Sequence, residues 1–83
     1  MNEKGRGGGK RAFRIEWEES RDGQGSLYLF GVESIGTYEN DRKSFQTVNG
    51  ILTVNGRDLS ILTFRSGAVG LVGEISGITY EKR

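Results

Sequence analysis

The chain of 83 residues contains no cysteine, no histidine and no proline. Without cysteine, neither a disulfide nor a thiolate zinc site can support the domain. Without histidine, the commonest general base is missing, which excludes serine and cysteine triads of the usual kind. No residue pattern indicates chemistry by carboxylates alone. We therefore expect a protein that is not an enzyme, with no catalytic, cofactor-binding or metal-binding residue and no cofactor.

The length is enough for one small domain. A domain of this size buries only about 60% of the surface that its unfolded chain exposes, so partner chains are the expected source of further stability. No apolar run approaches the roughly 18 residues of a membrane helix, and the N-terminus has no apolar segment of a secretory signal. We expect a cytoplasmic protein, in agreement with the lack of cysteine.

Positive charge is concentrated near the N-terminus. Residues 1–14 have a net charge of +4, whereas residues 15–83 have a net charge of −3. Residues 1–11 are rich in glycine and almost free of apolar residues, which predicts a flexible tail before a single β-domain at 12–83. The candidate anion-binding residues are Arg6, Lys10, Arg11 and Arg14. Such a segment can bind nucleic acid or anionic lipid, or can simply keep the protein dissolved. The remainder of the chain shows no matching basic stretch.

Short apolar segments separated by turn residues predict an all-β domain. Residues 13–17 alternate between apolar and charged side chains, whereas residues 26–30 and 59–64 are apolar on both faces. Residues 32–43 lack helical periodicity and predict a short extended piece followed by a loop. The expected fold is a small antiparallel meander of six or seven short strands that forms a sandwich or roll.

The most informative stretch is TVNGILTVNG at residues 47–56, which contains the Asn-Gly pair twice. Asn and Gly tolerate the positive φ angles of two-residue hairpin turns, so we predict turns at Asn49-Gly50 and at Asn55-Gly56. The same repeat also fits a short β-solenoid, although two copies are fewer than a stacked array needs.

The first of these turns predicts which residues face the core. A two-residue turn at positions 49 and 50 places Thr47 opposite Leu52 and Phe45 opposite Val54. These four residues form the more apolar face of the hairpin and are expected to be buried.

Further glycines are predicted to mark turns or bends, namely Gly67, Gly73 and Gly77. The apolar face switches between Ile75 and Ile78, and Gly77 is the most plausible site of a bulge or turn there. Residues 67–73 resemble a glycine-rich nucleotide loop only superficially, because the lysine and the hydroxyl residue of a phosphate loop are absent and no helix follows.

Aromatic and acidic side chains each allow two interpretations. One aromatic residue per strand is typical of core packing, although stacking platforms for single-stranded bases also use such residues. Three nearby carboxylates are typical of a solvated strand face, although two of them on one face could bind a hard cation. The residues concerned are Trp17, Phe30, Phe45, Phe64 and Tyr80 for the aromatics, and Glu16, Glu18 and Glu19 for the carboxylates.

Four segments carry a family resemblance. They are LFGV at residues 29–32, Ile35 with TYE at 37–39, T-x-x-G-x-L-x-V-x-G-x-x-L at 47–59, and G-x-V-x-L-x-G-x-I-x-x-I-x-Y at 67–80. In this order the segments resemble the YabP/YqfC family of bacterial sporulation proteins, over residues 27–80. Gly36 departs from the larger residue usual in the family, and the glycine-rich N-terminus is not a family feature.

The resemblance, which is closer to the YabP branch associated with spore coat assembly, implies a mother-cell protein at the forespore surface with no assigned enzymatic activity. It implies no functional residues that could be transferred to this chain. We expect a non-enzymatic protein of coat or envelope assembly that associates with itself, as a homo-oligomer, or with other spore-envelope proteins.

Two features of the residues themselves agree with association. Strands apolar on both faces need a second layer or another chain to cover them, and strands without proline leave their edges open for strand addition. The alternative is a small β-barrel that binds nucleic acid through the basic tail. A small carboxylate hydrolase is the third class considered, and nothing in the sequence supports it.

Overall fold

A computed structural model describes residues 13–83, which form six antiparallel strands in one sheet. The strands are β1 (Arg14–Glu19), β2 (Gly25–Phe30), β3 (Val32–Tyr38), β4 (Arg42–Thr47), β5 (Gly50–Arg65) and β6 (Ala68–Lys82). Their order in the sheet is β1-β2-β6-β5-β4-β3, so β3 to β6 form a meander and the β1–β2 hairpin adds to β6. The all-β prediction is confirmed. The solenoid alternative is wrong, because every neighbouring pair of described strands is antiparallel.

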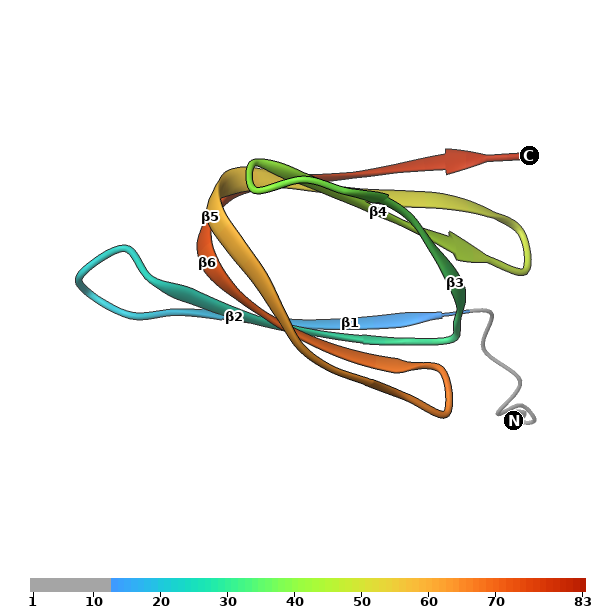
Figure 1. Ribbon diagram of the computed structural model, residues 1–83, viewed down its shortest axis with the longest axis horizontal. Coiled ribbons are helices and arrows are strands. Elements are labelled where there is room, and N and C mark those ends of the chain that lie inside the picture. The colour runs from blue at the N-terminus through green and yellow to red at the C-terminus, as the bar shows by residue number, and fades with distance from the viewer. Residues whose placement is uncertain (1–12) are drawn as a thin grey trace, which may run out of the picture.

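The sheet rolls over on itself because β5 and β6 are long and bent, at 16 and 15 residues. Figure 1 shows β1 and β2 in one layer with the start of β6, and β4 in the other with the start of β5 and the end of β6. Strand β3 leaves the end of β2 and runs from the first layer to the second. Two layers with a shared, bent hairpin give a small domain one enclosed core.

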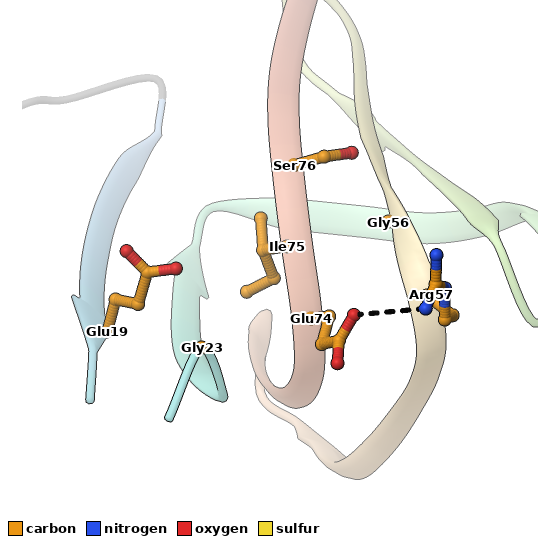
Figure 2. A pocket seen from close by; sticks show the side chains of 7 residues that line it. All are labelled: Glu19, Gly23, Gly56, Arg57, Glu74, Ile75 and Ser76. Atoms are coloured by element: carbon orange, nitrogen blue, oxygen red, sulfur yellow. Dashed lines mark ion pairs between the residues drawn. The ribbon is translucent and has the colours of Figure 1, made fainter. Parts of the chain in front are cut away.

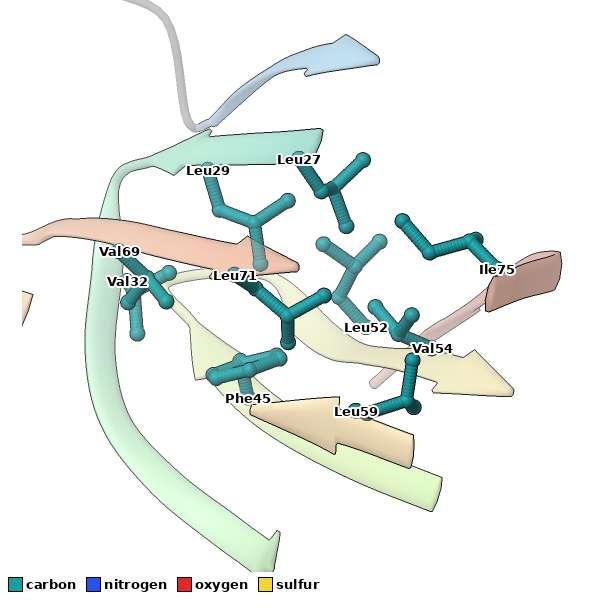
Figure 3. Close-up of a cluster of buried hydrophobic side chains, with 10 residues drawn as sticks. All are labelled: Leu27, Leu29, Val32, Phe45, Leu52, Val54, Leu59, Val69, Leu71 and Ile75. Carbon is teal, nitrogen blue, oxygen red and sulfur yellow. The ribbon is translucent and has the colours of Figure 1, made fainter. Parts of the chain in front are cut away.

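The core lies between the two layers (Figure 3). Ten apolar side chains are buried there, namely Leu27, Leu29, Val32, Phe45, Leu52, Val54, Leu59, Val69, Leu71 and Ile75. They come from β2, β3, β4, β5 and β6, so both layers contribute to the same cluster. Burial of this apolar surface is the main favourable term in folding.

The bends in the β5–β6 hairpin coincide with shifts in its register. Asn55 pairs with Gly77 but Gly56 pairs with Ile75, so Ser76 is an extra residue on β6. A second shift follows at Asp58, which has a φ of 54°. Extra residues of this kind bend a strand and increase its twist. The bulges therefore turn one long hairpin from the first layer into the second.

The prediction of a turn at Asn55-Gly56 is wrong, because both residues lie inside β5. Gly56 serves a different purpose, since a Cβ at this position would run into the carbonyl oxygen of Glu74 on β6. The glycine allows the two backbones to approach closely at the bend. Gly73 likewise lies inside β6 rather than in a turn, with a φ of 145° and with Asp58 and Leu59 close by.

The register at the first Asn-Gly pair also differs from the prediction. Thr47 ends β4 and Gly50 begins β5, so Val48 and Asn49 form the loop, and neither Asn49 nor Gly50 has a positive φ. Phe45 pairs with Leu52 rather than with Val54. The reason is β6, because a Cβ at Gly50 would clash with the carbonyl oxygen of Glu81, so the glycine is needed in the ladder.

The predicted core face of this hairpin is nevertheless correct. Phe45, Thr47, Leu52 and Val54 are all 0 to 1% exposed. The observed register differs by two residues, and side chains alternate with a period of two, so each residue stays on its predicted face. The hydroxyl of buried Thr47 donates a hydrogen bond to the carbonyl oxygen of Gly50 at 3.1 Å.

The remaining predicted turn glycines lie at irregular points of the β5–β6 hairpin. Gly67 lies in the tight turn between the two strands, with a φ of 78°. Gly77 lies in β6 directly after the extra residue Ser76. Ile75 and Ile78 both pack on the core, because this extra residue returns the chain to the same face. Among the described residues, no helix has the length and apolar character needed to span a bilayer.

Candidate interaction surfaces

A shallow cleft of about 430 Å³ lies where the end of β1 and the β1–β2 loop meet the bend of the β5–β6 hairpin (Figure 2). Its lining residues are Glu19, Gly23, Gly56, Arg57, Glu74, Ile75 and Ser76. Arg57 and Glu74 form an ion pair at 3.8 Å, and both side chains are exposed. An exposed pair of this kind is worth at most about 1 kcal/mol.

The one hydroxyl group of this cleft, that of Ser76, bonds to the backbone. The Ser76 hydroxyl donates a hydrogen bond to the carbonyl oxygen of Asn55 at 3.1 Å, which ties the two strands together at the bulge. A nucleophile needs an adjacent base, and none contacts this serine within the described residues. Residues 13–83 also hold no group of three or more His, Cys, Asp or Glu residues that could bind a metal ion.

Of the four candidate anion-binding residues, Arg6, Lys10 and Arg11 lie outside the described residues, and Arg14 begins β1. The guanidinium of Arg14 lies 3.3 Å from the Glu16 carboxylate and 4.3 Å from the centre of the Phe30 ring. Both contacts satisfy its positive charge locally. Arg14 is therefore already engaged with its own sheet.

The predicted aromatic residues do not form one platform. Phe45 is buried in the core, and Tyr80 packs on Phe13 with ring centres 4.6 Å apart, so this pair joins the segment before β1 to β6. Trp17 and Phe64 are each 44% exposed and lie on different strands. Core packing accounts for part of the set, and the rest is spread over the surface.

The three predicted carboxylates are exposed and lie along β1. Glu16 pairs with Arg14, and Glu19 reaches the cleft of Figure 2. Glu16 and Glu18 point to the face opposite Ile15 and Trp17, because side chains alternate along a strand. Their arrangement is that of a solvated strand face.

The two halves of β5 have different neighbours. Residues 51–55 pair with β4 on one side and with β6 on the other. Residues 60–65 pair with β6 only, and no other described strand runs beside them. We call residues 60–65 the open edge and residues 50–55 the closed half. A strand with one neighbour presents unpaired backbone N–H and C=O groups to other chains.

The loop between β3 and β4 sets the start of the open edge. The carbonyl oxygen of Asp41 accepts a hydrogen bond from the N–H of Gly56 at 3.0 Å, and that of Asn40 accepts one from the N–H of Leu59 at 2.8 Å. The loop thus covers the side of β5 up to Leu59. Beyond that residue the described chain offers no further cover.

Apolar side chains accompany the open edge. Leu62 is 64% exposed and Phe64 is 44% exposed. Leu62 is the extra residue at a third register shift, between Ile61 and Thr63. Of residues 60–65, only Arg65 is charged. Residues 60–65 are therefore apolar on both faces of the strand, but only one of these faces is covered.

The other outer strands carry the features that discourage edge pairing. Four of the six residues of β1 are charged. The pairing of β3 is interrupted by two register irregularities, which disturb the regular spacing of its backbone groups. Charges and bulges are the usual devices by which edges avoid other strands. The open edge of β5 contains the bulge at Leu62 but lacks charges along most of its length, so it is a candidate for strand addition.

Lys43 is a buried cation on the closed side of the sheet. It is 2% exposed on β4, opposite Val54, and its ammonium donates a hydrogen bond to the carbonyl oxygen of Glu39 at 2.6 Å. The ammonium also lies 4.1 Å from the centre of the Tyr38 ring. Burial lowers the pKa of Lys43 below its ordinary value of 10.5, against the opposing effect of Asp41 and Glu39. The side chain clamps the β3–β4 loop to the sheet.

The model of the YabP family matches residues 21–83. The chain belongs to the YabP family. A search of curated proteins found no match. Membership of the YabP family suggests a sporulation-related protein, and the family is not known to be enzymatic.

The YabP match includes β2 to β6 and therefore the closed half, the loop at residues 39–41 and the open edge, but it begins after β1. The sequence pattern does not reveal the open edge, because the second Asn-Gly pair predicts a turn that separates two short strands. The available signal is the uncharged run from Leu59 to Phe64, which is apolar on both faces.

Proposed function

We propose that this YabP-family chain is a non-enzymatic protein that acts in assembly of the spore coat or envelope by binding other protein chains. Family membership supports the link to sporulation. The observation that carries the binding role is the open edge, where residues 60–65 of β5 have one strand neighbour and bear exposed Leu62 and Phe64.

The proposed mode of binding is strand addition. A partner strand that aligns with the open edge gains backbone hydrogen bonds along its length, and contacts with alternate side chains supply specificity. Leu62 and Phe64 offer apolar surface for these contacts. Burial of an exposed leucine or phenylalanine contributes about 1.5–3 kcal/mol.

The proposed site of action is the cytoplasm of the mother cell, at the forespore surface. A fluorescent fusion of the full chain in a spore-forming host tests this, with Leu62→Lys as the variant of the open edge and Arg21→Asp as the control. Arg21 is exposed and lies in the β1–β2 loop, outside the open edge at residues 60–65.

We expect the wild-type fusion and the Arg21→Asp control to form a shell around the forespore, and Leu62→Lys to be diffuse. The lysine places a charge where a partner strand must pack. A diffuse wild-type fusion in sporulating cells would contradict the proposed role. A shell formed equally well by Leu62→Lys would contradict the use of the open edge.

A further inference from the structure

The tetrapeptide Thr-Val-Asn-Gly occurs twice in the chain, at residues 47–50 and at residues 53–56. Asparagine followed by glycine is especially prone to spontaneous deamidation, because glycine has no side chain to hinder attack of its backbone nitrogen on the asparagine side chain. The two copies are identical over four residues. A large difference in their reactivity would therefore come from the fold.

The first copy lies in the loop between β4 and β5. Val48 and Asn49 are both exposed and form an open bend, which lacks the closing hydrogen bond of the tight turn between β5 and β6. The carbonyl oxygen of Thr47, which would accept that bond, instead accepts one from the guanidinium of Arg83 at 3.1 Å. The N–H of Gly50 is therefore not tied to Thr47 across the loop.

The peptide group between Asn49 and Gly50 has a hydrogen bond that favours its ionisation. The carbonyl oxygen of Asn49 accepts a hydrogen bond from the backbone N–H of Arg83 at 2.9 Å. When the N–H of Gly50 loses its proton, the negative charge is shared between this nitrogen and that oxygen. A hydrogen bond to the charged form favours that form. Arg83 thus assists the loss of the proton that precedes attack.

The second copy lies inside the ladder of β5, with β4 on one side and β6 on the other. The carbonyl oxygen of Asn55 accepts a hydrogen bond from the hydroxyl of Ser76 at 3.1 Å. The N–H of Gly56 donates a hydrogen bond to the carbonyl oxygen of Asp41 at 3.0 Å. The nitrogen that would attack Asn55 is thus held, and reaction requires the ladder to open.

We infer that Asn49 is a site of spontaneous deamidation in the folded chain, and that the ladder protects Asn55. Gly50 is buried, so attack on Asn49 still requires the loop to move. That movement involves the two residues of an open bend, whereas reaction at Asn55 must break pairing within the sheet. Local openings of low free energy occur more often than those of the core strands.

The covalent steps involve no oxidation or reduction, and water is the only co-reactant. The nitrogen of Gly50 gives its proton to hydroxide and attacks the Cγ atom of Asn49. An N–Cγ bond forms, and the bond between Cγ and Nδ2 breaks. The departing Nδ2 group takes a proton from water and leaves as ammonia, which regenerates the hydroxide. A succinimide ring remains in the main chain.

Water then opens the ring at either of its two carbonyl groups. Addition at Cγ breaks the new N–Cγ bond and gives aspartate with the original main chain. Addition at the main-chain carbonyl carbon breaks the original peptide bond and gives isoaspartate, whose main chain runs through Cβ and Cγ. Both products carry a negative charge that asparagine lacks, and isoaspartate also lengthens the loop between β4 and β5 by one main-chain atom.

The test follows the folded, full wild-type chain during incubation at mildly alkaline pH and physiological temperature. Cleavage after lysine and arginine, performed briefly at mildly acidic pH, releases residues 44–57 as one peptide that contains both asparagines. Mass spectrometry with fragmentation quantifies the products at each position. We expect Asn49 to convert at least about tenfold faster than Asn55, because Asn55 reacts only in locally opened molecules.

Two controls separate the effect of the fold from that of the sequence. In chain unfolded by urea the native hydrogen bonds are lost, so the two rates should agree within about threefold. Asn49→Gln should abolish conversion at position 49, because glutamine closes a larger ring far more slowly. The matched variant Asn55→Gln should leave the rate at Asn49 unchanged. Thermal unfolding confirms that each variant is folded.

Three results would overturn the inference. The first is conversion of Asn55 in the folded chain as fast as that of Asn49, or faster. The second is an Asn49 that stays intact in the folded chain over the time in which unfolded chain converts fully. The third is a preference for Asn49 that persists unchanged in urea, because the sequence rather than the fold would then be its cause.

Discussion

The two halves of β5 contain nearly the same four residues in two different environments. Residues 51–54 read ILTV and residues 61–64 read ILTF. Leu52 is 1% exposed, whereas Leu62 is 64% exposed. Val54 is 0% exposed, whereas Phe64 is 44% exposed. Composition and strand propensity are nearly the same in both segments, so neither accounts for the difference in burial.

The difference comes from tertiary structure. The closed half pairs with β6 on one side and with β4 on the other, and it faces the core. The open edge pairs with β6 only, and it contains the bulge at Leu62, whose side chain is exposed. An apolar strand segment is buried in the core only where neighbouring strands of the sheet cover it. The same kinds of residue without a second neighbour stay exposed and leave backbone groups unpaired.

The largest expected effect comes from one substitution made in both halves. Leu52→Ala removes buried methyl groups from the core and should lower the free energy of unfolding by about 2–5 kcal/mol. Leu62→Ala removes an exposed side chain and should change it by less than about 0.5 kcal/mol at low protein concentration. Urea titrations of both variants measure the difference. Equal losses would show that the two halves are not distinct.

Glycine variants test the bend that separates the halves. Gly56→Ala places a Cβ against the carbonyl oxygen of Glu74 and should cost about 1–3 kcal/mol through strain. Gly77→Ala is the control on the neighbouring strand, because a Cβ there meets nothing within 4 Å. We expect the control to be neutral or slightly stabilising, since alanine reduces the entropy of the unfolded chain. A neutral Gly56→Ala, measured by thermal unfolding, would refute the close approach of the backbones.

A smaller effect concerns pH and comes from Lys43 on β4, which pairs with Val54 of the closed half. The pKa of Lys43 is lower in the folded chain than its ordinary value of 10.5, mainly because of burial. Between the folded pKa and 10.5 the unfolded chain binds more protons, so stability rises with pH in this interval. The cost of the buried charge is fully present below the folded pKa.

Lys43→Met removes this titration and keeps the length of the apolar stem. We expect the free energy of unfolding to depend less steeply on pH in the alkaline interval below 10.5 than it does in wild type. Urea titrations at a series of pH values measure the slope, and other lysines and tyrosines contribute equally to both chains. Parallel curves would mean that Lys43 is not perturbed.

Much of the fold could be predicted from period-two patterns and turn residues. The all-β class and the burial of Phe45, Thr47, Leu52 and Val54 follow from alternation, which tolerates an error of two residues in register. Asn55-Gly56 has the composition of a turn but lies in a continuous strand. Its glycine is required by the approach of Glu74, a contact with a residue 18 positions later that no local pattern contains.

The open edge can be predicted from the sequence only in part. The two-sided apolar pattern of residues 59–64 pointed to a need for cover, but which side stays open depends on where β4 and the loop at residues 39–41 end. Those limits are set by pairing between distant segments. The sequence therefore identifies Leu62 and Phe64, the residues of the proposed interface, as apolar strand residues but not as exposed ones.

Amide hydrogen exchange on the full chain at several protein concentrations tests the central claim most directly, because it compares the two halves of β5 residue by residue. We predict that amides in residues 51–55 are protected at every concentration. Amides of the open edge that point away from β6 should exchange fast when the protein is dilute. Protection of these amides as strong as that of residues 51–55 in dilute protein would contradict the account.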